Sequence, residues 1–110
     1  MKIKKYDIYL ANLDPTIGVE IKKTRPVVVV SDDMMNKFLQ TVVVCPLTTQ
    51  LHPKWRGRIQ ILCEERESEI AVDQIRTISK LRLIKKMDSL STTKAKELRL
   101  LITEMYGECG

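Results

Sequence analysis

Residues 26–45 read PVVVVSDDMMNKFLQTVVVC, in which two runs of β-branched residues, VVVV and TVVVC, flank a polar centre. Unbroken runs of this kind are typical of strands that are buried on both faces, so we expect two central strands of a sheet. Pro26 suits the first position of its strand, where a missing N–H is tolerated. Between the runs, Asp32 and Asp33 can cap a short helical turn that reaches Phe38.

Shorter segments on either side of this centre also have strand character. Between Lys5 and Leu10, apolar and polar residues alternate, which predicts a half-buried strand with Tyr6 and Ile8 facing the core. The same reasoning predicts strands at residues 56–63, 70–72, 75–78 and 81–87. The connections are expected to be two long polar loops, residues 11–25 and 46–55, and an exposed acidic turn, EERESE, at residues 64–69.

The C-terminal segment changes from an alternating to a helical period. Ser91 can cap a helix that Gly107 ends. The apolar residues between them recur at helical spacing: Ala95, Leu98, Leu101, Ile102 and Met105. The sequence therefore predicts a mainly β fold with a C-terminal helix, in which the helix covers one side of a small, strongly bent sheet or barrel. At 110 residues, the chain (1–110) has the length of a single domain.

The chain carries 19 Lys and Arg against 14 Asp and Glu, which gives a net charge of +5 and a pI near 9.2. A modest basic excess favours a polyanionic partner, although solubility alone also explains it. The cations gather in three clusters: Lys22, Lys23 and Arg25; Lys54, Arg56 and Arg58; and Arg76, Lys80, Arg82, Lys85 and Lys86. If the loops converge, these clusters form a groove suited to phosphates; otherwise they are solvated faces.

The composition gives little support to metal or cofactor chemistry. One histidine, His52, cannot build a multi-histidine zinc shell, and the three cysteines lack the C-x-x-C spacing of metal and redox sites. We therefore expect no metal and no cofactor. Of the three, Cys45 and Cys63 lie in or beside apolar strands and Cys109 is left over, which is typical of a reduced, cytoplasmic protein. The sequence has neither a signal-peptide core nor a membrane span, so no membrane association is expected.

Two aromatic side chains of the second loop have open roles. Trp55 lies between Lys54 and Arg56 and can stack on a nucleobase, but a lone tryptophan also fills a core or a subunit interface. His52 is the only side chain that can serve as an imidazole general base near neutral pH, while a solvated loop histidine is the simpler interpretation.

The most specific group of candidate site residues lies at the ends of the two central strands. Arg25 immediately precedes the first apolar run and Thr48 follows the second, where side chains are held rigidly yet face solvent. An arginine fork matches two phosphate oxygens, and a threonine hydroxyl can donate a further hydrogen bond to the same group. Structural roles are the alternative. Arg25 can pair with Glu20 or Asp73; Thr48 can satisfy a strand-end backbone group, and Asp73 with Gln74 can belong to a turn.

Longer motifs follow one another along nearly the whole chain: LDPTIGVE, TRPVVVVSDD, VVVCPLTTQ and AVDQIRTISKLRL, before the terminal helix. In this order they resemble the MazF/PemK family of toxin endoribonucleases from bacterial toxin–antitoxin pairs. The resemblance implies a small SH3-like β-barrel of the MazF/PemK/CcdB type, associated as a symmetric homodimer whose interface forms part of an RNA-binding groove. It also implies cleavage of single-stranded RNA, usually messenger RNA, at short sequence motifs without a metal. A cognate antitoxin with a flexible acidic segment would compete for the basic groove.

The resemblance further implies site residues. Arg25 matches the family's catalytic arginine, Thr48 its hydroxyl partner and Glu20 its loop carboxylate. Metal-free cleavage commonly uses the 2′-hydroxyl of the RNA as nucleophile and leaves a 2′,3′-cyclic phosphate and a 5′-hydroxyl. Arg25 would stabilise the phosphorane and, as a weaker second role, protonate the leaving group; Thr48 would anchor the phosphate, and Glu20 is the candidate base. Further RNA contacts are expected from Lys22, Lys23, Thr49, Gln50, Trp55, Arg56, Asp73, Gln74 and Arg76.

Two departures from some PemK-type members affect these assignments. Those members place a histidine before the loop glutamate and an arginine two residues before the aspartate of the D-Q pair, where this chain has Val19 and Ala71. Without that neighbouring arginine, Asp73 is expected to contact substrate or support structure rather than act as a base. The alternative function is a non-catalytic toxin of the same fold that binds and poisons DNA gyrase. An RNA-binding module without catalysis is a weaker possibility.

Overall fold

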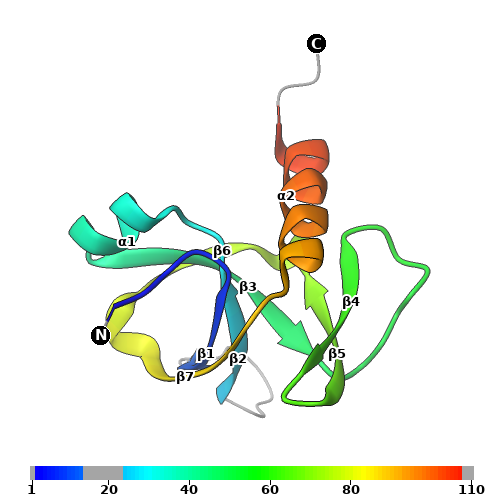
Figure 1. Cartoon of the computed structure of the whole chain (residues 1–110), viewed down its shortest axis with the longest axis horizontal. Coiled ribbons are helices and arrows are strands. Elements are labelled where there is room, and N and C mark those ends of the chain that lie inside the picture. The colour runs from blue at the N-terminus through cyan, green and yellow to red at the C-terminus, as the bar shows by residue number, and fades with distance from the viewer. Residues whose placement is uncertain (1, 14–23, 108–110) are drawn as a thin grey trace.

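Strands β2 (Thr24–Val29) and β3 (Thr41–Thr48) lie side by side at the centre of a seven-stranded antiparallel sheet (Figure 1). The computed structural model describes residues 2–13 and 24–107. Its strand order is β4-β5-β3-β2-β1-β7, and β6 also pairs with β3. The remaining strands are β1 (Asp7–Asn12), β4 (Arg58–Cys63), β5 (Arg66–Ala71), β6 (Arg76–Ser79) and β7 (Leu83–Ser89).

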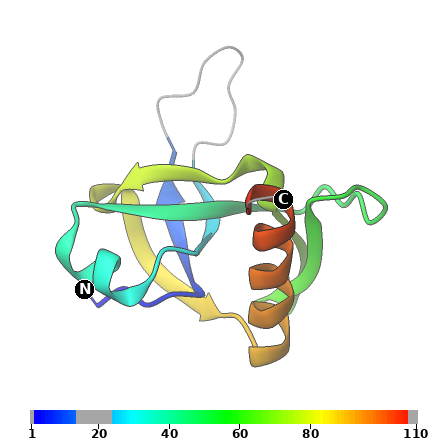
Figure 2. The same cartoon turned by 90° about the horizontal axis from the view of Figure 1, so that it is seen from above.

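The helical elements are α1 (Asp33–Phe38), α2 (Thr92–Tyr106) and two short 3-10 helices, η1 (Val72–Gln74) and η2 (Lys80–Arg82). The predicted caps are confirmed, because Asp32 accepts from the Met35 N–H and Ser91 from the Lys94 N–H. Helix α2 packs against one side of the curled sheet, with Leu98 fully buried (Figures 1 and 2). Within the described residues, no helix has the length and apolar character needed to span a membrane.

The curl of the sheet gives the central strands a core on each face. Ile8, Val28 and Cys45 belong to the core beneath α2, whereas Tyr9, Val27 and Val44 belong to a second core that residues of β6 and β7 help to close. The predicted burial of β2 on both faces is confirmed. The prediction of a half-buried first strand is wrong, because the second core covers the face on which Tyr9 lies. A mainly β fold with one covering helix is confirmed, and the sheet is a curled half-barrel.

Both predicted loops are shorter in the structure, because residues at their ends belong to the adjoining strands. On one edge, β3 pairs with β6 through Val44 and with β5 from Leu47, so Pro46 lies between two ladders, where its missing N–H costs nothing. The second loop therefore begins after Thr48. At the first loop, Asn12 pairs with Thr24 as the last residue pair of β1 and β2.

The acidic stretch EERESE is part of a hairpin and not an exposed turn. Glu64 and Glu65 have φ values of 50° and 67° and form its two-residue turn, the backbone that tight hairpins require. Strand β5 begins directly afterwards, and its Glu69 is fully buried. The prediction of an exposed turn is wrong because residues 66–69 belong to a strand. Successive side chains of a strand point to opposite faces, so an acidic segment can still place one carboxylate in the interior.

Candidate functional site

The pairing of β2 with β3 brings Arg25 and Thr48 together. Val27 pairs with Pro46, so the same register two residues further places Arg25 opposite Thr48. Both side chains line a pocket of about 260 Å³, whose other lining residues are Pro46, Gln50, His52, Trp55, Arg58, Ala71 and Gln74. A second pocket of about 540 Å³ shares Arg25, Thr48 and Gln50 with the first. The two pockets therefore adjoin one another at these three residues, and we refer to the pair as the groove.

Arg25 is half-buried near the start of β2. The suggested ion pair with Asp73 does not form, because Asp73 binds Arg58 instead, and the suggested partner Glu20 lies outside the described residues. Among residues 2–13 and 24–107, no hydrogen bond or ion pair engages the Arg25 side chain. Its planar fork of donors can therefore bind two oxygens of one phosphate.

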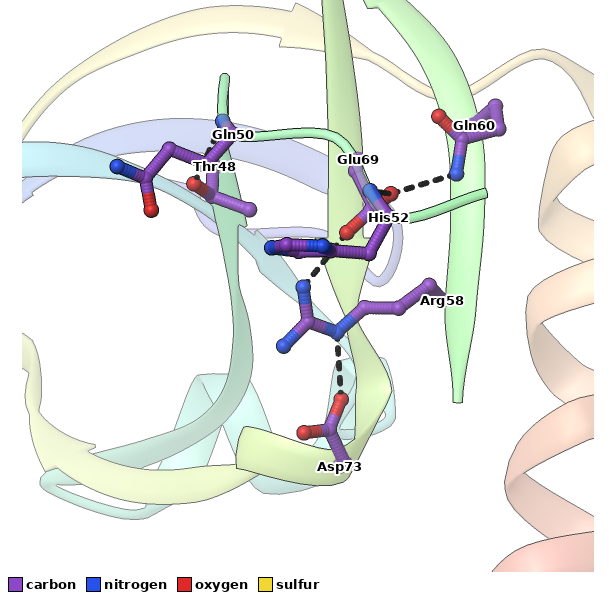
Figure 3. Close-up of polar contacts among 7 residues, drawn as sticks. All are labelled: Thr48, Gln50, His52, Arg58, Gln60, Glu69 and Asp73. Carbon is purple, nitrogen blue, oxygen red and sulfur yellow. Dashed lines mark hydrogen bonds and ion pairs between the residues drawn. The ribbon is translucent and has the colours of Figure 1, made fainter. Parts of the chain in front are cut away.

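Thr48 has the structural role that was its alternative interpretation. Its Oγ1 accepts a hydrogen bond of 3.0 Å from the Gln50 N–H, at the point where β3 ends (Figure 3). A hydroxyl has one hydrogen to donate and can accept two bonds, so accepting from Gln50 leaves its hydrogen free. The anchoring of the loop and the donation of a hydrogen bond to a phosphate oxygen are compatible.

Arg58 is the central site residue that sequence reasoning missed. Its side chain is only 5% exposed, and its Nη1 donates to Glu69 Oε2 at 2.6 Å while its Nε donates to Asp73 Oδ1 at 2.9 Å (Figure 3). It pairs in register with Ala71, so β4 supplies Asp73 with an arginine partner although no arginine stands two residues before it in the chain. This ion pair gives Asp73 a structural contact, which is one of the two roles expected for it. The available signal was the alternation of polar Arg58 with apolar Ile59.

Glu69 links three parts of the site. Its Oε1 accepts from the His52 N–H at 2.6 Å and from Gln60 Nε2 at 2.7 Å, and its Oε2 accepts from Arg58 (Figure 3). Burial raises the pKa of Glu69, but the hydrogen bonds from Gln60, His52 and Arg58 outweigh this effect and hold the pKa below its usual value. Glu69 is therefore a fully buried carboxylate that stays ionised at neutral pH.

This lowered pKa predicts a pH-dependent stability. A carboxyl group whose pKa is lower in the folded state contributes stability above its unfolded pKa, about 4.3, and loses that contribution as the pH falls through the folded pKa. We expect Glu69→Gln to lower the free energy of unfolding at pH 7 and to bring the variant closer to the wild type as the medium is acidified. Urea unfolding from pH 7 down to pH 3 measures this difference. A constant gap would contradict the assignment.

Trp55 and His52 form a stacked pair at the mouth of the pocket. Their ring centroids lie 3.7 Å apart with an interplanar angle of 7°, and the Arg58 guanidinium lies 4.8 Å from the Trp55 centroid. Trp55 is 53% exposed, so it does not fill the core, which was one of its alternatives. Contacts with the imidazole and the guanidinium hold the indole in place, while its exposed part offers an apolar surface for stacking.

The other predicted site residues divide into two groups. Gln74 lines the first pocket. Thr49 lines the second pocket, which Arg66 also lines. Arg56 instead forms an ion pair with Glu104 of α2, and exposed Arg76 pairs in register with Val44 and lines neither pocket. The three basic clusters thus converge only in part. The predicted site residues Glu20, Lys22 and Lys23 lie outside the described part of the chain.

Metal-ligating side chains do not cluster in the described segments, which contain no group of three or more His, Cys, Asp or Glu residues placed to hold a metal ion. Cys45 and Cys63 are free and buried. Burial, followed by the charge of Asp73, raises the pKa of the Cys45 thiol to about 12. The Cys45 thiol therefore stays protonated and is a poor nucleophile.

Comparison with known proteins identifies similar chains. The family model described as PemK-like, MazF-like toxin of type II toxin-antitoxin system matches residues 4–106. The chain is 38% identical to Endoribonuclease EndoA of Bacillus subtilis (strain 168) over 82% of each chain. It is 35% identical to Endoribonuclease MazF of Staphylococcus saprophyticus over 96% of this chain and 92% of that one. A mycobacterial endoribonuclease solved in complex with its cognate antitoxin has the same fold, with a TM-score of 0.81, 16% identity and 98% coverage of both chains.

Proposed function

Because the chain belongs to the family of MazF- and PemK-like toxins and is an endoribonuclease of that family, we propose that it cuts single-stranded RNA, messenger RNA above all, at a short sequence motif and without a metal ion. One observation carries the proposal: Arg25 and Thr48 line the same pocket, and the Arg25 fork has no partner among the described residues. A phosphodiester bound there can meet an arginine fork and a hydroxyl together.

The proposed reaction is a transesterification within the RNA. The 2′-hydroxyl oxygen attacks the adjacent phosphorus, its proton passes to a base, and the P–O5′ bond breaks to leave a 2′,3′-cyclic phosphate and a 5′-hydroxyl. The Arg25 guanidinium stabilises the charge of the phosphorane, and Thr48 donates its hydroxyl hydrogen to the scissile phosphate. Arginine stays charged, so protonation of the 5′-oxygen by Arg25 is its lesser role. Glu20 is the base that the family resemblance implies.

The groove gives the RNA a path on either side of the scissile phosphate. Thr49 and Gln50 line one side, and Gln74 with the exposed face of Trp55 line the other. A stacked base gains sequence-tolerant affinity from the indole, and hydrogen bonds to base edges supply selectivity. Flanking contacts are assigned to the remaining polar residues, Lys22, Lys23, Arg56, Asp73 and Arg76.

The proposed partners follow from the toxin assignment. A cognate antitoxin with an acidic segment would occupy the groove, compete with RNA and inhibit cleavage, as the similarity to an antitoxin-bound mycobacterial endoribonuclease supports. We also propose that the protein acts in the cytoplasm as a homodimer whose interface extends the groove.

A cleavage assay tests the proposed function. We expect the purified protein to cut a long single-stranded RNA at a short recurrent motif, with equal rates in the presence and absence of EDTA. Primer extension should map the new 5′ ends, and end-group analysis should find 5′-hydroxyls and 2′,3′-cyclic phosphates. Loss of cleavage in EDTA would contradict the metal-independent reaction. A protein that cuts no RNA but traps DNA gyrase on DNA would overturn the function itself.

A further inference from the structure

We infer that His52 is a general base of this cleavage, the role that the family resemblance gives to Glu20. The assignment rests on the proposed RNA-cleaving function and extends it, because it adds a proton acceptor to the phosphate anchor and the charge stabilisation already described. His52 lines the pocket that also contains Arg25 and Thr48. Figure 3 shows its imidazole reaching from the loop after β3 towards Thr48.

The loop holds this imidazole in a defined position. The backbone N–H of His52 donates to buried Glu69 at 2.6 Å, and the backbone carbonyl of His52 accepts from the backbone N–H of Trp55 at 2.9 Å. The Trp55 ring stacks on the imidazole. A solvated loop histidine, the simpler interpretation of the sequence, would need none of these contacts. A side chain fixed in this way is pre-organised for proton transfer.

The ring nitrogens of His52 are available. Within residues 2–13 and 24–107, neither nitrogen forms a hydrogen bond. The charged groups around the pocket are Arg25 of β2, Arg58 of β4, Glu69 of β5 and Asp73 of η1. A ring nitrogen without a hydrogen-bond partner can offer its lone pair to a substrate proton.

The proton balance of the step is simple. A ring nitrogen of His52 takes the proton of the 2′-hydroxyl while the O2′–P bond forms. The electron pair of the breaking P–O5′ bond stays on the 5′-oxygen, which takes a proton from water in the open pocket. The imidazolium then returns its proton to solvent, and the enzyme is restored.

Two variants with a pH series test this role. Because only neutral imidazole is a base, the wild-type rate is expected to rise from acidic pH towards neutrality and then level off. We expect His52→Gln to lower kcat about 100-fold, to change KM less than threefold and to abolish this rise. Free imidazole should restore activity to His52→Ala. Arg25→Ala is the matched control, because imidazole cannot replace a guanidinium and should not rescue it. Circular dichroism melts check that each variant is folded.

Each outcome separates the role of His52 from the proposed function. A folded wild-type protein that cuts no RNA would overturn both. Wild-type cleavage with a His52→Gln variant of similar rate, or one that keeps the wild-type pH profile, would overturn only the assignment of the base. A slow His52→Ala variant that imidazole does not rescue would also overturn it and make His52 a positioning residue.

Discussion

Replacing Arg25 with alanine is expected to lower the rate of RNA cleavage about 10³-fold, because a donor aimed at the charge that develops in the transition state is worth about that much. The Arg25 side chain forms no hydrogen bond or ion pair with another described residue, so its removal breaks none of these contacts. The free energy of unfolding should therefore change by less than about 1 kcal/mol. Single-turnover cleavage and urea unfolding of the same preparations measure the two effects separately.

Two variants control for this result. Arg25→Lys keeps the charge but loses the planar fork, so we expect it to recover a minor part of the rate. Arg99→Ala removes the same charge from an exposed position of α2 and should cleave at the wild-type rate. Cleavage by Arg25→Ala within threefold of the wild type would remove Arg25 from the mechanism.

The fold was largely predictable because its signals are local. The valine runs at residues 27–30 and 42–44 predict buried strands, and the apolar stripe that includes Leu98 predicts the buried face of the helix. Both predictions are confirmed. The errors arise where pairing across the sheet overrides local composition. Pro46 is tolerated inside β3 because two partner strands meet there, and no local pattern shows this junction.

The site was predictable only where a motif marked it. The motifs predict Arg25 and Thr48 as site residues, and the register of β2 and β3 places the two side by side. The sequence around Arg58 predicts a basic cluster and that around Glu69 an acidic turn, because each segment by itself is typical of a solvated face. Their partnership depends on the pairing of β4 with β5, a tertiary fact that neither segment contains.

Replacing Arg58 with alanine is expected to cause the largest loss of stability, about 3–5 kcal/mol, because removing one partner of a buried pair leaves an uncompensated charge. Arg58 is 5% exposed and Glu69 is fully buried, so water cannot replace the lost guanidinium without rearrangement. Asp73→Asn removes the other partner of Arg58, but Asp73 is 39% exposed, and its loss should cost less than about 1 kcal/mol. Urea unfolding at pH 7 compares the variants.

The double variant Arg58→Ala/Glu69→Gln distinguishes a charge effect from a packing effect. If the cost of Arg58→Ala comes from the stranded carboxylate, neutralising Glu69 should recover part of the stability, and the double variant should be more stable than Arg58→Ala alone. If the cost comes from the lost contacts of the arginine stem, the second change recovers nothing. The first outcome would also explain why the loop at His52 is ordered: Glu69 accepts the His52 N–H, and Arg58 keeps that acceptor charged.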